Sequence, residues 1–405
     1  MDNRKARKLT MEFEDEPPRA QAGIFKNDKK GGKKSTDKKK NTTTEGSRRV
    51  KKEKTGGNGG DKEKAETTTQ NKTQQSAAPA QGHPHVEAWV QRALDIGVEK
   101  LREEFRMLAK YTRPGMTQEV FNKYQEKDMD RTRNRYQDVP CQDQYIVPLA
   151  PPSPIEYVHA NFVGTPMGDH RFICTQGPLD QTCEEFWWMV IQQKVEQVIM
   201  LCKTIETGKY KCAQYWPANA GEKKEFVTAG KKDAVPIVVE NLTGAKPMER
   251  DGEIQITMLN VTANGQTMKV RHLHWTDWPD RGVPPCKLTS LELLSAVRGS
   301  KAPIVVHCSA GIGRTGTIVA IEYILETISS QDSNTPVPLM PDLVKSIRDQ
   351  RAYSIQNDIQ YLYIHRVMLN YFLDKYKAKY ASILTPENVT KYEKFVKDYN
   401  QAVGQ

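Results

Sequence analysis

The segment 304–317, IVVHCSAGIGRTGT, is the most informative stretch of the chain. Its apolar run predicts a buried strand over Ile304–His307, and the apolar positions after Thr315 predict a helix. Gly311 and Gly313 allow the intervening loop to turn tightly. A loop that leads into a helix N-terminus points several backbone N–H groups at one spot, where the helix dipole adds positive potential. The segment therefore predicts a cradle for an anion such as a phosphoryl group.

Two side chains frame this loop, Cys308 at its start and Arg314 at its end. Arg314 can close the cradle with a bidentate fork to two phosphoryl oxygens. A helix N-terminus with an adjacent cation lowers the pKa of a cysteine thiol by several units. We therefore expect Cys308 to be a thiolate that attacks the bound phosphorus, with no metal ion or cofactor required. A structural cysteine in a glycine-rich turn would not need the paired arginine, and the nucleotide-binding pattern GxxxxGK[ST] is absent.

Strand-like and helical patterns surround this segment without a regular βαβ alternation. Strands are predicted over 157–162, 171–174, 198–201, 236–240, 254–261, 267–274 and 304–307. Helices are predicted over 86–111 with a break near Gly97, and over 181–194, 288–299, 315–329, 340–350 and 357–373. These patterns predict an α/β or α+β body of about 290 residues around one large sheet. The last thirty residues predict a loosely attached helical extension.

The net charge of +10 comes mostly from residues 1–85, where 21 Lys+Arg face 12 Asp+Glu. This stretch has few aromatic or branched apolar residues, so it cannot bury enough surface to fold, and we expect a disordered, solvated tail. Its basic charge also allows contact with an acidic partner, an anionic membrane or nucleic acid. The run KKGGKKSTDKKK at 29–40 is compatible with a nuclear import signal.

The rest of the composition bears on the compartment. The sequence contains no run of about 18 consecutive apolar residues, so we expect no membrane span. Its N-terminal segment has no apolar core, so we expect no secretory signal peptide. The seven cysteines are odd in number and contain no C-x-x-C pair, which argues against a disulfide framework and a zinc knuckle. We therefore expect a reducing compartment, the cytoplasm or the nucleus.

The segment HCSAGIGRTG at 307–316 resembles the signature of the cysteine-dependent protein tyrosine phosphatases, in their tyrosine-specific, non-receptor-like branch. Further matches follow in family order: RTRNRYQDV at 131–139, YVHANFV at 157–163, TQGPLDQTCEEFWWMV at 175–190, KCAQYWP at 211–217, WPDRGVP at 278–284 and QNDIQY at 356–361. The resemblance implies one α/β (α+β) catalytic domain with a central, highly twisted mixed sheet flanked by helices. It divides the chain into a basic tail at 1–85, a catalytic domain at 86–376 and a C-terminal helical extension at 377–405.

The resemblance also implies catalytic roles for side chains around the cradle. Asp280, in the WPD segment, is implied as the acid that protonates the tyrosyl oxygen and then as the base toward water. Asp277 precedes the tryptophan and is expected to be a solvated loop residue. Gln356 is implied to position the hydrolytic water, Thr315 to donate to the departing sulfur, and His307 to set the surroundings of the nucleophile.

A second group of implied residues binds the substrate. Tyr136 would stack on the phosphotyrosine ring in a slot too deep for phosphoserine or phosphothreonine. Asp138 would hold the peptide backbone, and Val139 would flank the slot. Arg281 stands where the family usually has an aromatic residue, and it could stack on the substrate or bind acidic flanks. The remaining implied contacts are Ser309, Ala310, Gly311, Ile312, Gly313 and Gln360 in substrate binding, and Glu206, Lys211 and Trp278 as supports.

These residues predict a protein tyrosine phosphatase that works through a cysteinyl-phosphate intermediate on phosphotyrosine-containing proteins, as a monomer. The alternative is a catalytically weak or inactive phosphotyrosine-binding module, which the retained acid and recognition tyrosine disfavour. A dual-specificity phosphatase is disfavoured by the deep slot. A low-pKa, accessible Cys308 would also be prone to oxidation to the sulfenic acid.

Overall fold

The computed structural model describes residues 84–108, 111, 132–228, 234–329 and 336–405, which fall within one compact unit, 79–405. The predicted tail, apart from its last two residues, lies outside the described residues, as does Arg131 of the RTRNRYQDV match.

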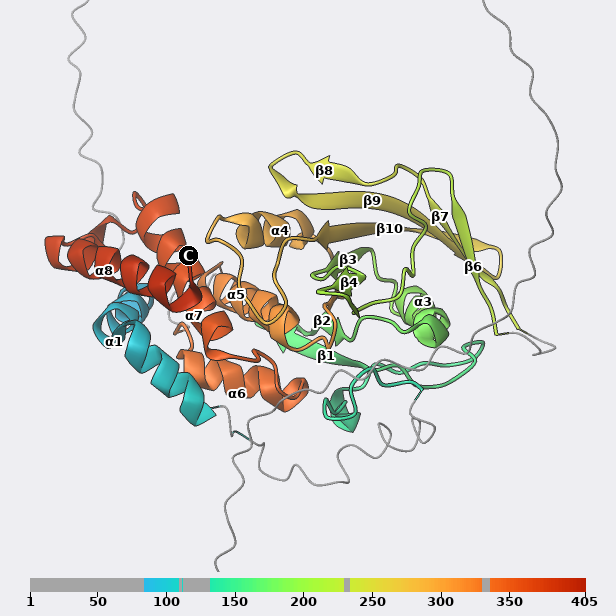
Figure 1. The fold of residues 1–405 in the computed structure, drawn as a ribbon, viewed down its shortest axis with the longest axis horizontal. Coiled ribbons are helices and arrows are strands. Elements are labelled where there is room, and N and C mark those ends of the chain that lie inside the picture. The colour runs from blue at the N-terminus through green and yellow to red at the C-terminus, as the bar shows by residue number, and fades with distance from the viewer. Residues whose placement is uncertain (1–83, 109–110, 112–131, 229–233, 330–335) are drawn as a thin grey trace, which may run out of the picture. The chain divides into compact units, whose positions relative to one another are not determined.

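A nine-stranded mixed sheet forms the centre of this unit (Figure 1). Its strand order is β1-β2-β11-β3-β10-β9-β7-β6, and β8 pairs with β9. The bounds are β1 Ala160–Thr165, β2 Gly168–Thr175, β3 Gln197–Met200, β6 Lys223–Phe226, β7 Ile237–Asn241, β8 Lys246–Met248, β9 Asp251–Ala263, β10 Gln266–Trp275 and β11 Ile304–His307. The β2–β11, β11–β3 and β3–β10 pairs are parallel, and the others are antiparallel. A separate hairpin joins β4 Ile205–Glu206 to β5 Lys209–Tyr210.

Strand β11 lies inside the sheet, between two parallel neighbours. Ile304 pairs with Phe172 of β2 on one side and with Gln197 of β3 on the other. All four of its residues are buried, as expected for an unbroken apolar strand in a parallel region. The carboxyl end of β11 therefore leads the cradle segment out of the most constrained part of the sheet.

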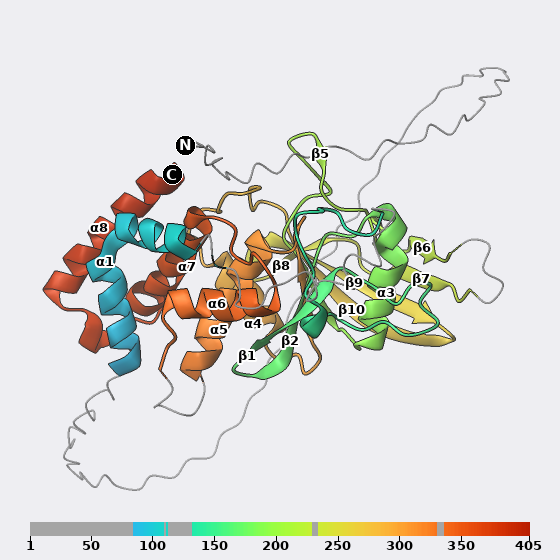
Figure 2. The ribbon, with the colours of Figure 1, turned by 90° about the horizontal axis from the view of Figure 1, so that it is seen from below.

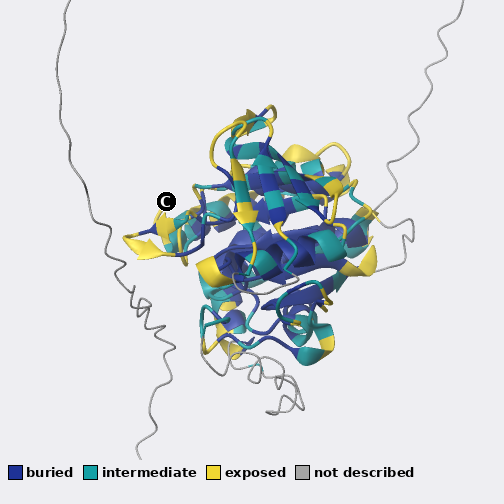
Figure 3. Ribbon diagram, turned by 90° about the vertical axis from the view of Figure 1, so that its right-hand side faces the viewer, coloured by how far each residue is buried: buried dark blue, intermediate teal, exposed yellow. Residues whose placement is uncertain are grey.

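Helices cover both faces of the sheet. Their bounds are α1 Pro84–Leu108, α3 Cys183–Gln192, α4 Thr289–Val297, α5 Gly313–Ser329, α6 Met340–Gln350, α7 Asp358–Asn370 and α8 Pro386–Val403. Helix α3 lies across the sheet from α4 and α5 (Figure 1). Helix α5, which follows β11, is buried along most of its length. Figure 3 shows that buried residues concentrate where the helices meet the sheet, while exposed residues lie on the outer loops. The predicted mixed sheet flanked by helices is thus confirmed.

The predicted elements differ from the observed ones mainly at their ends. Helix α1 is kinked at Gly97, which adopts φ 70°, where the sequence predicted a break. The strand predicted over 157–162 begins three residues later, at Ala160, and the helix predicted from Thr315 begins at Gly313. The strands that were not predicted, β4, β5, β6 and β8, are short and mostly exposed, so they carry no apolar alternation.

The C-terminal helix α8 is packed more closely than the loose attachment that the sequence predicted. Phe395 and Tyr399 of α8 are almost fully buried, and Lys391 forms an ion pair with Asp95 of α1. Figures 1 and 2 show α1, α7 and α8 side by side. Helix α8 is therefore attached to the rest of this unit through α1 and α7. None of the helices in the described ranges is long and apolar enough to cross a membrane.

Candidate active site

The loop after β11 folds into a cradle around the sulfur of Cys308. The backbone N–H of Gly311 points at Cys308 Sγ, at 3.3 Å. Gly311 adopts φ 70°, and a Cβ at this position would lie 2.0 Å from the carbonyl oxygen of Thr175. Only glycine therefore fits here, because both the conformation and the space exclude a side chain. Helix α5 begins at Gly313, so its N-terminus opens toward the same loop.

A buried arginine supports the cradle by binding its carbonyl groups. Arg351, with 0% exposure, donates from Nε to the carbonyl of Gly311 and from Nη2 to the carbonyl of Ala310, both at 3.1 Å. Its other hydrogen bonds reach Asn161 Oδ1 at 2.9 Å and His159 Nδ1 at 3.1 Å. Because these carbonyls are held toward Arg351, the intervening amides stay turned toward the sulfur. Sequence analysis missed Arg351, since a charged residue at the end of a predicted helix is usually exposed.

Arg314 lies in the first turn of α5 and is held by a carboxylate. Its Nη1 and Nη2 donate to Glu206 Oε1 at 2.6 Å and Oε2 at 2.8 Å. Burial by itself would lower the pKa of the Arg314 guanidinium, but the hydrogen bonds to Glu206 act in the opposite direction and the net shift is upward. The bidentate pair fixes the plane of the guanidinium, so Arg314 is oriented before any anion binds.

Asp280 reaches the same place from the loop after β10. Its Oδ1 lies 3.2 Å from Arg314 Nη2, and its Oδ2 lies 3.1 Å from Lys211 Nζ. Its side chain is 29% exposed, so the carboxyl group is accessible to solvent. The neighbouring Asp277 is 63% exposed and pairs only loosely with Lys203, at 3.7 Å. The structure thus brings Asp280, and not Asp277, to the cradle.

The WPD loop is held at both of its ends. Trp278 is 1% exposed, packs edge-on against Trp275 and Tyr363, and donates from Nε1 to the carbonyl of Gly282 at 3.0 Å. Its own carbonyl accepts from Arg314 Nη1 at 3.0 Å. Burial of this large indole therefore places the backbone on which Asp280 is carried.

Asn357 also holds the WPD loop, through a hydrogen bond to its backbone. Its Nδ2 donates at 2.7 Å to the carbonyl of Arg281, which adopts a positive φ of 55°. Its Oδ1 accepts from the backbone N–H of Gln360 and so caps helix α7. One asparagine thus joins the WPD loop to the start of α7, a link that sequence analysis did not identify.

The two predicted glutamines lie over the beginning of α5. A Cβ on Gly313 would come within 3.0 Å of both Gln356 Oε1 and Gln360 Nε2. The backbone N–H of Gln356 donates to Gln360 Oε1 at 2.9 Å, and Gln360 is 1% exposed. The absence of a side chain at Gly313 therefore lets these amides approach the cradle.

The predicted recognition segment lies on another side of the cradle. The hydroxyl of Tyr136 is hydrogen-bonded to Ser309 Oγ at 2.9 Å, and Ser309 Oγ also donates to the carbonyl of Lys211 at 3.1 Å. Asp138 is exposed at the surface, while Val139 is 1% exposed and packs inward. Tyr136 is thus adjacent to the cradle, and Asp138 lies at the surface beside it.

A buried chain of hydrogen bonds extends from the backbone of Cys308 into the sheet. His307 Nδ1 lies 3.1 Å from the carbonyl of Cys308, and its Nε2 lies 2.7 Å from the hydroxyl of Tyr215. The same hydroxyl lies 2.8 Å from His272 Nε2. Because the carbonyl can only accept, Nδ1 of His307 carries the proton, Tyr215 donates to Nε2 and accepts from His272. Burial lowers the pKa of His307 to about 3, so the ring is neutral. Sequence analysis did not single out Tyr215 or His272.

Thr315 and Ile312 complete the set of predicted residues. The Thr315 hydroxyl is buried and has no hydrogen-bond partner among the described residues, so it can donate to a group in the cradle. The carbonyl of Ile312 accepts from the backbone N–H groups of Gly316 and Ile355, both at 3.0 Å. Over the described ranges, no cluster of histidine, cysteine and carboxylate side chains has the arrangement of a metal site.

The chain can now be compared with known proteins. The family model described as protein-tyrosine phosphatase matches residues 130–370. Human tyrosine-protein phosphatase non-receptor type 9 is 33% identical over 259 residues, which cover 59% of this chain and 41% of that protein. Human receptor-type tyrosine-protein phosphatase zeta is 32% identical over 258 residues, covering 61% of this chain and 11% of that protein. The chain therefore spans less than half the length of these relatives.

Solved structures agree with the sequence relatives. A structure of PTPN18, described with distinct HER2 tyrosine phosphorylation sites, has a TM-score of 0.62 and 27% identity, covering 72% of this chain and 100% of that one. The catalytic domain of human protein tyrosine phosphatase non-receptor type 18 has a TM-score of 0.61 and 26% identity, covering 71% and 99%. Since the family model alone spans more than half of its length, the chain belongs to the protein-tyrosine phosphatase family.

Proposed function

We propose that this protein hydrolyses phosphotyrosine in other proteins through a cysteinyl-phosphate intermediate. The observation that carries the proposal is the convergence of three groups on one cradle: the Cys308 sulfur facing the amide of Gly311, the oriented Arg314, and Asp280 within 3.2 Å of Arg314. A nucleophile, an anion-binding cation and a carboxyl group in one place are what acyl or phosphoryl transfer without a metal requires.

In the first step the Cys308 thiolate attacks phosphorus. The S–P bond forms while the bond from phosphorus to the tyrosyl oxygen breaks, and protonated Asp280 gives its proton to that oxygen. A phosphoryl dianion in the cradle would compete with Asp280 for Arg314 Nη2, which leaves Oδ1 available to hold the proton. Arg314 and the loop amides stabilise the charge that develops on the equatorial oxygens.

In the second step water replaces the sulfur. Gln356, which lies against Gly313, holds the water in line with the S–P bond, and Asp280 takes a proton from it. The S–P bond breaks as the O–P bond forms, and inorganic phosphate leaves. The unpartnered hydroxyl of Thr315 donates to the departing sulfur, which lowers the barrier for its expulsion as a thiolate.

Tyr136 supports the choice of phosphotyrosine as substrate. Its hydroxyl reaches Ser309 within the cradle segment, so its ring forms a wall beside the phosphate site. A phenyl phosphate can stack along such a wall, whereas a phosphoserine or phosphothreonine side chain is too short to carry its phosphate to the base. PTPN18 is described in complex with HER2 phosphopeptides, which supports phosphotyrosine-containing proteins as the substrate class here.

The proposal is tested by turnover of the full chain on an aryl phosphate and on a phosphotyrosine peptide in the presence of EDTA. Cys308→Ser should abolish phosphate release, while Cys286→Ser, which changes a cysteine outside the cradle, should not. Asp280→Ala should lower kcat by roughly 10²–10⁴-fold, whereas Asp277→Ala should leave it unchanged. Phosphopeptide binding without phosphate release by the unmodified chain would instead identify a binding module.

A further inference from the structure

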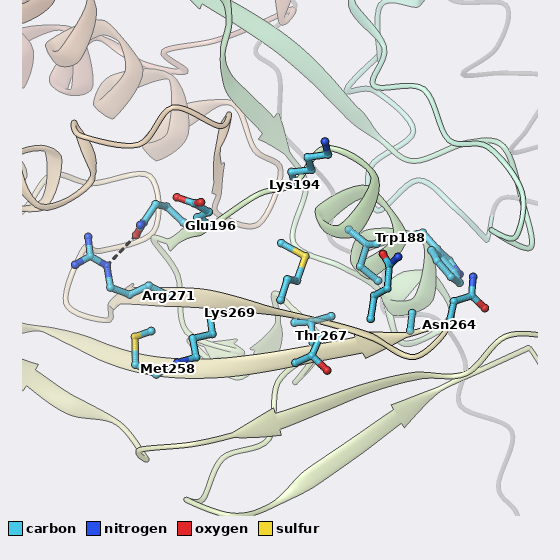
Figure 4. A pocket seen from close by; sticks show the side chains of 14 residues that line it. Trp188, Lys194, Glu196, Met258, Asn264, Thr267, Lys269 and Arg271 are labelled. Carbon is cyan, nitrogen blue, oxygen red and sulfur yellow. Dashed lines mark hydrogen bonds between the residues drawn. The ribbon is translucent and has the colours of Figure 1, made fainter.

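A groove of about 820 Å³ lies between helix α3 and strands β9 and β10, and it shares no residue with the active site. Trp188 and Ile191 of α3 form one apolar wall, and Val261 and Met268 form the other. Figure 4 shows the lining side chains around β10, with Trp188 and Lys194 on one side and Met258 and Lys269 on the other. The volume is in the range of pockets that bind ligands.

The groove follows an unpaired strand edge. Strand β3 is shorter than β10, and its pairing begins with Gln197 opposite Arg271. The preceding residues of β10, Gln266–Val270, therefore have β9 on one side and no strand on the other within the described part of the chain. Five residues of strand correspond to an open edge of about 16 Å.

The backbone of β10 presents hydrogen-bonding groups to this edge. The backbone N–H of Arg271 points away from β9, because it donates to the carbonyl of Glu196 at 2.8 Å. Backbone groups of alternate residues point to the same side of a strand, so those of Lys269 and Thr267 also face the groove. The two-residue turn at 264–265, which pairs Ala263 with Gln266, gives the same alternation. Two N–H and two C=O groups thus remain for an added strand.

The charge of the groove is positive. Lys194, Lys269 and Arg271 line it, against a single carboxylate, Glu196. Arg271 is half-buried and donates to Gln197 Oε1 and to the carbonyl of Ala296, neither of which is an anion. Burial lowers the pKa of the Arg271 guanidinium, in keeping with a cation that lacks a counterion. An anionic group in the groove would supply that counterion.

We propose that this groove binds an extended, acidic segment of a partner protein, which adds as a strand to the free edge of β10. The backbone of the segment pairs with Thr267 and Lys269, and alternate apolar side chains enter the slot between α3 and β10. Its acidic side chains face Lys194, Lys269 and Arg271. Lysines at a strand edge repel like-charged strands, so they select for an acidic partner. The site would dock a substrate or regulator apart from the phosphotyrosine pocket.

The test measures fluorescence anisotropy of a labelled eight-residue peptide that alternates valine with glutamate, titrated with the full chain. The decisive variant is Thr267→Pro, which removes an N–H that faces the groove without removing a ladder bond to β9. The matched control, Thr267→Ala, loses the same side-chain contact with Thr262 and keeps the N–H. Affinity should fall about tenfold in Thr267→Pro and stay within about twofold in Thr267→Ala.

Charge is tested in parallel. Lys269→Glu should weaken binding about tenfold, and so should replacing the peptide's glutamates with lysine. The matched control is Lys246→Glu, which changes an exposed lysine on β8 and should have no effect.

Hydrogen exchange at the amides of Thr267 and Lys269 should slow when the peptide binds, and aryl phosphate turnover should be the same in every variant. Equal binding by the Pro and Ala variants, or no binding at millimolar peptide, would overturn the proposal. Self-association of the chain that Thr267→Pro abolishes would assign the edge to a second copy instead.

Discussion

Replacing Tyr215 by phenylalanine removes a single oxygen that joins two buried histidines. The hydroxyl donates to His307 Nε2 at 2.7 Å and accepts from His272 Nε2 at 2.8 Å, and Tyr215 is fully buried. Phenylalanine keeps the aromatic packing against Phe186 and Trp216. The substitution therefore isolates the polar contribution and leaves one buried donor and one buried acceptor without partners.

The magnitude follows from those two orphaned groups. Each buried polar group left unpaired costs about 1–3 kcal/mol, so the free energy of unfolding should fall by about 3 kcal/mol. The control is Tyr399→Phe, because the Tyr399 hydroxyl is equally buried but has no hydrogen-bond partner among the described residues. That control should change stability by less than about 0.5 kcal/mol.

Equilibrium unfolding in urea, read by circular dichroism, measures both variants against the parent chain. The slope of the transition should be unchanged, so that a lower midpoint reports lower stability. If Tyr215→Phe and Tyr399→Phe lower the midpoint equally, the hydrogen-bonded chain from His272 to His307 contributes nothing, and the reasoning is refuted.

Three further predictions concern the cradle and its surroundings. Arg351→Met should lower kcat/KM for an aryl phosphate about 100-fold, because the carbonyls of Ala310 and Gly311 lose their anchor; unchanged kcat/KM would contradict the positioning role. Acid should destabilise the fold: burial lowers the pKa of His159 and His307 to about 3 and of His365 to about 4, from an ordinary 6.5. Below pH 6.5 only the unfolded chain takes up protons on these histidines, so the free energy of unfolding is full above pH 6.5 and falls as the pH approaches 3–4. At pH 5 the loss is roughly 2 kcal/mol per histidine. Equal urea midpoints at pH 7.5 and pH 5 would exclude this contribution of the histidines. Iodoacetamide at pH 6.5 should alkylate Cys308 before Cys141, Cys174 and Cys183, as peptide mass spectrometry would show, because burial raises the pKa of Cys141 to about 11 and of Cys174 and Cys183 to about 12. Faster labelling of those three cysteines would contradict the proposed role of Cys308 as the nucleophile.

The centre of the fold could be predicted because its signals are local. The first three of the four residues of β11 are apolar, and α5 follows this strand with apolar positions at helical spacing. Strands β6 and β8 could not be predicted in this way, since they lie toward the outside of the sheet and expose Lys223 and Lys246. Their pairing depends on β7 and β9, which is information that a single short segment does not contain.

The residues of the site also fall into those that a local motif predicts and those that only tertiary contacts identify. Cys308 and Arg314 could be placed because they belong to one short motif whose chemistry is self-contained. Arg351 and Tyr215 act through contacts with residues 40 or more positions away, and their types are ordinary for a helix end and a loop. Neither periodicity nor spacing predicts that Arg351 is buried against the cradle, or that Tyr215 is buried between two histidines. Tertiary packing decides their roles, so the three-dimensional structure was needed to identify them.

The bond from Asn357 to the carbonyl of Arg281 has a consequence for the timing of the reaction cycle. In the proposed mechanism, the WPD loop delivers the proton in the first step, and the neighbouring Gln356 positions the water for the second. Any excursion of the WPD loop must either rupture this amide contact or pull the beginning of α7 with it. Movement of the WPD loop and movement of Gln356 would then be coupled. Departure of the tyrosine phenol and entry of the water would both depend on the hydrogen bond between Asn357 and the Arg281 carbonyl.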